Sequence, residues 1–203
     1  MTKDFLLRLT EEHHGAGVFP VYGRLLEEQR LTRGGPLLPM WYCTAALRRA
    51  FGGENVLVLG CTNDSLLAHL LGATPVNPLP PHYHCPNCHR LIFDAHADDG
   101  WDLPDLACPE CGTSMAADGH NLRSRSLIGE SVVPLQVPQE QFAPVCAWLR
   151  DYWAQRDCQT VTEPYSDAEV MGLRLTLPEG VQGVFEVRVL YPTCLLYTSD
   201  AAD

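Results

Sequence analysis

Four cysteines in two Cys-x-x-Cys pairs are the residues of this sequence best suited to chemistry. The pairs are Cys85-Pro-Asn-Cys88 and Cys108-Pro-Glu-Cys111, and 19 residues separate them. Each turn presents two thiolates from one tight loop, and two such turns complete the tetrahedral ligand shell of zinc. Because four cysteines leave no position for water, we expect one structural, non-catalytic Zn²⁺ per chain.

The segment between the two pairs offers a competing interpretation. Four of its side chains have the chemistry of a catalytic metal site: Asp94, His96, Asp98 and Asp99. On that hypothesis the chain is a metal-dependent hydrolase. A solvated loop is the simpler interpretation, because loop tips seldom hold ligands in fixed positions.

The composition limits the class of protein. The chain has 203 residues, 46% of them hydrophobic, and nine cysteines, an odd number that disulfides cannot use up. It has no apolar run of about 18 residues and no pattern typical of a secretory signal. We therefore expect a folded, cytoplasmic protein that does not enter a membrane and whose cysteines hold metal.

The net charge of −11 argues against a protein that grips nucleic acid over its whole surface. The sequence GHNLRSRSLIG, after the second cysteine pair, carries Arg123 and Arg125 with no acid nearer than Asp118 and Glu130. This is where we expect any contact with DNA phosphates, and a solvated loop is the alternative interpretation. Two arginines predict weak binding at best, with a dissociation constant no tighter than roughly 10⁻⁴ M at physiological salt. A protein partner is left open.

Hydrophobic periodicity predicts an α+β protein, with small mixed helix and strand units flanking a four-cysteine zinc ribbon. Helices are expected at residues 3–14, 22–31, 39–51 and 138–155, and strands at residues 55–60, 172–177 and 183–190. Asp64 is expected to cap a further helix, and His13 and His14 to act as cations at a helix end. Three prolines in residues 76–83 predict a boundary.

A family resemblance rests on the segments VNPLPPHYHCPNCHRLIF and GWDLPDLACPECGTSMAADGH. These segments and their spacing resemble the zinc-binding segment of the PolC-type DNA polymerase III alpha subunit, a replicative polymerase. The match runs from about Asn77 to His120 and extends more weakly back through DSLLAHLLGAT. The resemblance implies a link to DNA replication.

In that family two catalytic elements flank the zinc-binding segment. The upstream glycine-rich run suits nucleotide phosphates, and the matching LVLGCTNDS keeps Gly60 and Ser65 but has no arginine. The downstream Pro-Asp-Ile-Asp-Leu-Asn-Phe supplies two aspartates for metal ions, whereas here Leu135 and Val137 stand in their places. Because apolar side chains cannot ligate magnesium, we expect no catalytic residues. The chain is also too short to hold the palm, fingers and thumb of such an enzyme.

The resemblance therefore predicts a non-catalytic paralogue or fragment linked to replication. The alternative is a fragment of a genuine polymerase whose activity lies in missing regions. The predicted organisation is a PolC-like mixed segment (residues 1–75), the zinc ribbon (76–122), a small α+β unit (123–193) and a tail (194–203). The tail, CLLYTSDAAD, resembles translated sequencing-adapter read-through, and without residues 195–203 the net charge is −9 because Asp200 and Asp203 are removed.

Overall fold

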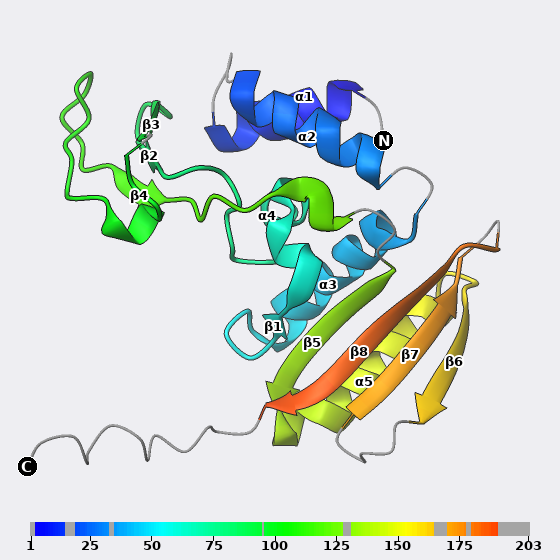
Figure 1. The fold of residues 1–203 in the computed structure, drawn as a ribbon. Coiled ribbons are helices and arrows are strands. Elements are labelled where there is room, and N and C mark those ends of the chain that lie inside the picture. The colour runs from blue at the N-terminus through cyan, green and yellow to red at the C-terminus, as the bar shows by residue number, and fades with distance from the viewer. Residues whose placement is uncertain are drawn as a thin grey trace, which may run out of the picture.

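The computed structural model describes residues 3–14, 19–32, 35–94, 96–127, 131–164, 170–177 and 180–190. The predicted tail, residues 194–203, lies outside the described residues. Figure 1 shows an upper pair of helices, a small strand unit at the left and a larger sheet at the lower right. Helices and strands both contribute, so the predicted α+β class is confirmed. Within the described ranges, no helix is long and apolar enough to cross a membrane.

The first three helices are α1 (Lys3–His14), α2 (Phe19–Leu31) and α3 (Leu37–Phe51), close to the predicted ranges. Leu6 and Leu9 of α1, and Val21 and Leu25 of α2, are buried at three- or four-residue spacing. That spacing places them on one face of each helix. α3 ends at Gly52, whose φ of 90° is open to glycine but strained for other residues.

The chain after α3 is less regular than predicted. The expected strand at residues 55–60 is reduced to β1 (Leu57–Val58), followed by the 3₁₀ helix η1 (Gly60–Asp64) and α4 (Leu66–Leu70). The predicted cap, Asp64, is wrong because Asp64 lies in the last turn of η1. Ser65 caps α4 instead, and its hydroxyl accepts a hydrogen bond from the Ala68 amide at 3.0 Å.

A five-stranded sheet combines β1 with four strands from the C-terminal part of the chain (Figure 1). The C-terminal elements in chain order are β5 (Val132–Pro138), helix α5 (Gln139–Ala154), β6 (Gln159–Pro164), β7 (Val170–Thr176) and β8 (Gln182–Leu190). The strand order is β1-β5-β8-β7-β6, with β5 and β8 parallel and the other pairs antiparallel. The structure confirms the predicted α5, β7 and β8. β5 and β6 were not predicted.

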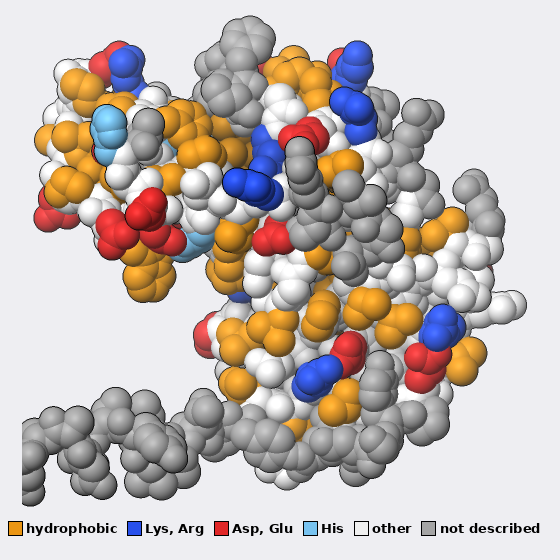
Figure 2. Space-filling model, in the orientation of Figure 1, with side chains coloured by type: hydrophobic (Ala, Val, Ile, Leu, Met, Phe, Trp, Pro, Cys, Tyr) orange, Lys and Arg blue, Asp and Glu red, His pale blue; other side chains and the backbone are white. Residues whose placement is uncertain are grey.

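The two faces of this sheet differ in chemistry. Val133, Leu135 and Val137 of β5 are fully buried on the face that packs against α5, whose Leu149 is also fully buried. The other face has no described helix over it, and Figure 2 shows acidic and basic side chains next to each other among apolar ones there. Two ion pairs lie on this face: Glu163 with Arg174, and Glu186 with Arg188. Alternation along the strands thus separates the core from a half-polar surface.

The cysteine segment forms a separate three-stranded antiparallel sheet in the order β3-β2-β4. Its strands are β2 (His82–His84), β3 (Leu91–Phe93) and β4 (Ala116–Asp118), and the 3₁₀ helix η2 (Gly100–Asp102) lies between β3 and β4. A further 3₁₀ helix, η3 (Ser124–Leu127), leads to β5. The pairing of β1 with β5 joins the chain before this small sheet to the chain after it. The predicted domain boundaries remain a prediction.

Candidate metal centre

The two cysteine turns have the same backbone shape. The first turn follows β2, and the amide of His89 donates to the carbonyl of Cys85 at 3.0 Å. In the second turn the amide of Gly112 donates to the carbonyl of Cys108 at 2.8 Å. The donor residue has a positive φ in both turns, 58° at His89 and 73° at Gly112. Glycine adopts this conformation freely, whereas at His89 it costs about 1–2 kcal/mol.

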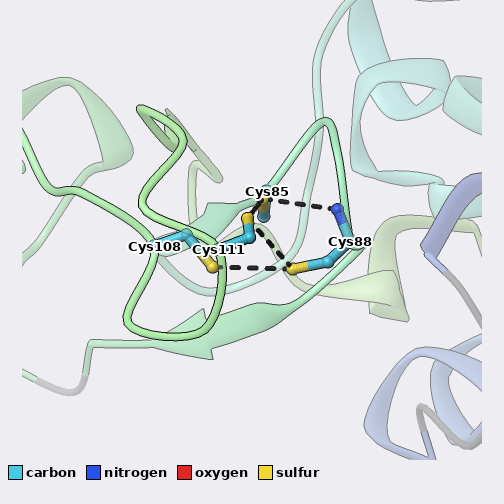
Figure 3. A group of neighbouring side chains, drawn as sticks. All are labelled: Cys85, Cys88, Cys108 and Cys111. Carbon is cyan, nitrogen blue, oxygen red and sulfur yellow. Dashed lines mark hydrogen bonds between the residues drawn. The ribbon is translucent and has the colours of Figure 1, made fainter.

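These turns bring the four predicted cysteines together (Figure 3). All four Sγ atoms lie within 4.8 Å of one another. The Sγ–Sγ distance is 3.5 Å for Cys85–Cys111 and Cys88–Cys108, and 3.8 Å for Cys88–Cys111. A tetrahedral zinc with Zn–S bonds of about 2.3 Å sets its sulfurs about 3.8 Å apart. The cluster therefore fits a metal ion with four thiolate ligands.

The surroundings of the cluster favour thiolates unequally. Thr113 Oγ1 lies 3.4 Å from Cys111 Sγ, and hydrogen bonds from the Thr113 side chain and backbone, and from Asn87, lower the pKa of Cys111 to about 5. A hydrogen bond from the Arg90 amide lowers the pKa of Cys88. The contacts of Cys88 with the Cys85 and Cys108 thiols outweigh this effect and raise the pKa of Cys88 to about 12. Neighbouring thiolates repel one another without a cation. A bound divalent ion would supply that cation and release protons as it binds.

One contact of the centre has no signal in the cysteine spacing. Arg90, two residues after Cys88, forms an ion pair with Glu110, which lies inside the second turn. The pair ties one turn to the other across the cluster. Both side chains are about half exposed, and exposed pairs of this kind contribute little stability, about 0–1 kcal/mol. The sequence signal for this ion pair was the opposite charge of Arg90, just after the first turn, and Glu110, inside the second turn.

Two acidic residues between the turns, Asp94 and Asp99, form hydrogen bonds within the segment. The Asp94 carboxylate accepts a hydrogen bond from the His96 amide at 2.8 Å. Asp99 caps η2 by accepting from the Trp101 amide at 2.9 Å and pairs with His120 Nδ1 at 2.9 Å. Among the described residues, the four cysteines form the one group of three or more side chains able to hold a metal ion. The segment's four predicted hydrolase ligands are thus not brought together.

A histidine contact links α1 to the cysteine unit. The His14 ring, 6% exposed, meets the His84 ring edge-on with their centroids 5.8 Å apart. Neither ring nitrogen of His14 has a hydrogen-bond partner among the described residues. Burial, helped by the nearby His84, His82 and His13, lowers the pKa of His14 from 6.5 to about 3. The predicted cation is therefore wrong for His14, because this ring is too deeply buried to carry a proton at neutral pH.

The start of α4, where the family resemblance predicts a lost phosphate site, holds a carboxylate from the same chain. Glu28 of α2 is fully buried. It accepts hydrogen bonds at 2.9 Å from the Ser65 hydroxyl and from the Leu66 and Leu67 amides. Arg24 donates to the same carboxylate at 2.7 Å. These donors are therefore already satisfied by an internal anion, a role that sequence reasoning missed because Glu28 lies far from Ser65 in the chain.

The other predicted sites lie on β5 and in the segment just before it. Leu135 and Val137 are fully buried toward α5, so their positions offer no metal ligand to solvent. Arg123 is exposed and lines a pocket of about 260 Å³, which three other residues also line: Arg24, Glu27 and Ser124. The side chain of Arg125 lies outside the described residues. The predicted DNA contact at these two arginines thus remains a prediction.

The fold and the site together define a mixed helix and strand protein with a four-cysteine cluster that could hold a metal ion. Part of the chain resembles DNA polymerase III of the PolC type. The protein of that name from Ureaplasma parvum is 47% identical over 77 aligned residues. The aligned region covers 38% of this chain and 5% of that relative. The Latilactobacillus sakei protein is 37% identical over 113 residues, 54% of this chain and 8% of the relative.

A third relative, from Bacillus subtilis, has the same name and is 46% identical over 72 residues, 34% of this chain and 5% of the relative. The aligned regions thus span 5 to 8% of these relatives' lengths. No family model matches the chain. The predicted resemblance to the PolC type is confirmed for part of the chain.

Proposed function

We propose that this chain is a cytoplasmic zinc-ribbon protein related to the PolC-type DNA polymerase III alpha subunit, linked to DNA replication but without nucleotidyl transfer of its own. The ribbon is a structural unit whose Zn²⁺ is held by Cys85, Cys88, Cys108 and Cys111. The ion has no open coordination position there, so it would fix the two turns and take no part in a reaction.

The burial of Leu135 and Val137 is the observation that carries the non-catalytic part of this proposal. The family's two-aspartate element needs carboxylates that reach metal ions and solvent. Here β5 presents both positions to the hydrophobic core under α5. The internal Glu28 carboxylate at the start of α4 supports the same conclusion, because it occupies donors that a nucleotide phosphate would need.

Primer extension tests the catalytic half of the proposal. Purified protein is incubated with primer-template DNA, Mg²⁺ and deoxynucleotides, and a PolC-type polymerase serves as the positive control. We expect no template-dependent incorporation above background. Template-dependent incorporation that copurifies with the chain in a constant ratio through successive purification steps would contradict the proposal.

Contact with DNA belongs to the proposal as a weak, local interaction at Arg123 and Arg125. Two arginines neutralise about two phosphates, which gives a salt slope near −1.8 for duplex DNA. Fluorescence anisotropy with primer-template DNA at two salt concentrations measures that slope. Micromolar binding that persists at raised salt and disappears in Arg123→Ala with Arg125→Ala would make DNA binding the main function.

A second candidate is a fragment of a genuine PolC-type polymerase whose activity lies in missing regions. The small share of each relative that the aligned regions span, 5 to 8%, favours it. Sequencing the intact gene past the codon for Thr193 separates the two candidates. A continuous reading frame of many hundreds of further codons would support the fragment and overturn the separate protein.

A further inference from the structure

We propose that β6 is a docking edge at which a second copy of this chain adds its own β6 antiparallel, giving a symmetric dimer with one sheet across both copies. β6 is the last strand in the sheet order and pairs with β7 along its whole length. Across the described ranges, its outer edge has no backbone partner. Figure 1 shows β6 at the right-hand side of the large sheet, beyond β7.

From Gln159 to Glu163 the edge has no lysine, proline or bulge, and the one proline of β6, Pro164, stands at the last position of the strand. Residues 159–162, Gln-Thr-Val-Thr, carry no charge, and valine and threonine favour extended backbone. Val161 is 60% exposed, although it is a large apolar side chain in a regular strand. Natural edge strands are usually protected by lysine, proline or a bulge. Glu163 is the one charged residue of β6, and Arg174 of β7 pairs with it at 2.5 Å.

The sequence of β6 is complementary to itself about Val161. In an antiparallel pair with its twofold axis at this residue, Val161 lies opposite the partner's Val161. Thr160 then lies opposite the partner's Thr162, and Gln159 opposite the partner's Glu163. Valine pairs, threonine pairs and an amide facing a carboxylate are favourable cross-strand contacts, each worth about 0.2–1 kcal/mol. No like charges face each other, so a second copy fits this edge better than an arbitrary strand does.

Two opposing effects set the strength of the dimer. Because only one six-residue strand from each copy takes part, we expect the pairing to bury less surface than the roughly 1,200 Å² of a stable interface, as transient complexes do. Each copy carries a net charge of −11, so the copies repel one another at a distance. Salt screens this repulsion and leaves the neutral strand pairing intact. We therefore expect a dissociation constant on the order of 10⁻⁴ M that tightens as salt rises.

Sedimentation equilibrium of the zinc-loaded full chain tests the dimer at concentrations on either side of this constant. Val161→Lys places a charge opposite its own copy and should abolish the rise in average mass with concentration. Val161→Thr keeps an uncharged strand former and should keep most of that rise. A monomer at every concentration and salt, or equal dimerisation of wild type and Val161→Lys, would overturn the proposal.

Cross-linking supplies a second measurement that does not depend on the lysine variant folding. With the twofold axis at residue 161, Val161→Cys places two thiols opposite each other, at a Cα–Cα distance of about 4.5–5.5 Å that a disulfide can span. Mild oxidation should give covalent dimer many times faster than in wild type or in Gln159→Cys, whose new thiol faces the partner's Glu163. Equal rates for all three proteins would exclude this register, whereas faster dimer formation by Gln159→Cys would show a shifted one. If Val161→Lys or Val161→Cys altered the binding of a different protein to β6 but left self-association unchanged, the proposed dimer would also be overturned.

Discussion

The carboxylate of Glu28 accepts a hydrogen bond from the hydroxyl of Ser65 at 2.9 Å, in a fully buried position. Ser65 caps α4, so the two residues together satisfy the first amides of that helix. Helix starts attract anions because their amides are unpaired. Here α2 supplies the anion and thereby fixes the position of α4 against the N-terminal helices.

Replacing Glu28 should therefore destabilise the protein. Glu28→Ala leaves the Leu66 and Leu67 amides without an acceptor, and we expect a loss of about 2–4 kcal/mol of unfolding free energy. Urea unfolding followed by circular dichroism measures the change. The neighbouring exposed Glu27 provides the control, since Glu27→Ala should stay within about 0.5 kcal/mol of wild type. Similar losses in both variants would refute this role for Glu28.

Restoring the family's aspartate on β5 should unfold the sheet and not create activity. Leu135→Asp buries a carboxylate under α5 with no partner, and we expect a cost of more than about 3 kcal/mol. Gln136→Asp is the matched control, because Gln136 lies on the opposite, half-exposed face of the same strand. Thermal unfolding compares the two variants. A stable Leu135→Asp protein that extends primers would contradict both the burial and the proposed loss of catalysis.

Metal removal should unfold the cysteine unit and spare the larger sheet. The small core of that unit has four buried residues, two of which are Cys85 and Cys108 themselves. Structural zinc contributes about 10–16 kcal/mol to such units. After chelation, hydrogen exchange should lose protection at Tyr83 and Met115 and keep it at Phe185.

The test protein is a double variant that carries both Cys88→Ser and Cys111→Ser. The control is Cys158→Ser, because Cys158 lies outside the cluster. The double variant should bind no zinc by elemental analysis, whereas the control should bind one ion per chain. Zinc retained by the double variant would show that these cysteines are not the ligands.

Acid should destabilise the protein through His14. Its pKa is about 3 when folded and 6.5 ordinarily, so between these values the unfolded chain binds the extra proton. The contribution of His14 is complete above pH 6.5 and is lost on acidification, at about 1.4 kcal/mol per pH unit below 6.5.

Unfolding free energies of wild type and His14→Leu at pH 7.5 and 5.5 isolate this residue, since loss of metal affects both proteins alike. Wild type should lose about 1.4 kcal/mol more than His14→Leu over this interval. His96→Leu, in the exposed acidic segment, should behave as wild type. A wild type and a His14→Leu protein with the same pH dependence would disprove a neutral buried His14.

Local patterns predicted much of the fold and the clustering of the four cysteines. Leucine spacing predicted α1 to α3, and the two Cys-x-x-Cys turns predicted the cysteine cluster, because both signals lie within a few residues. β5 was missed because Pro134 and Pro138 argue against a strand. β5 forms nonetheless, because β1 pairs with only two of its residues on its outer side, Leu135 and Gln136. The carbonyl of Pro134 still accepts a hydrogen bond from the Leu59 amide.

The errors arose where distant segments decide the local structure. Asp64 and Ser65 are both residue types that often cap helices. In the structure Ser65 is the cap, and its hydroxyl also donates to the buried carboxylate of Glu28, a residue far away in the sequence. The charge of His14 depends on its burial against β2, which no helical pattern reveals. Contacts between segments far apart in the chain have no periodic signature, so sequence patterns alone could not supply them.

The insertion of the cysteine unit between β1 and β5 also bears on the order of folding. Val58 pairs with Leu135 across the whole of that unit, so the sheet must close a long loop before the pair forms. Closing a loop costs more entropy as the loop lengthens. A cysteine unit that is already clamped by its metal shortens the effective loop, so metal loading should speed the refolding of a sheet that the ion never touches.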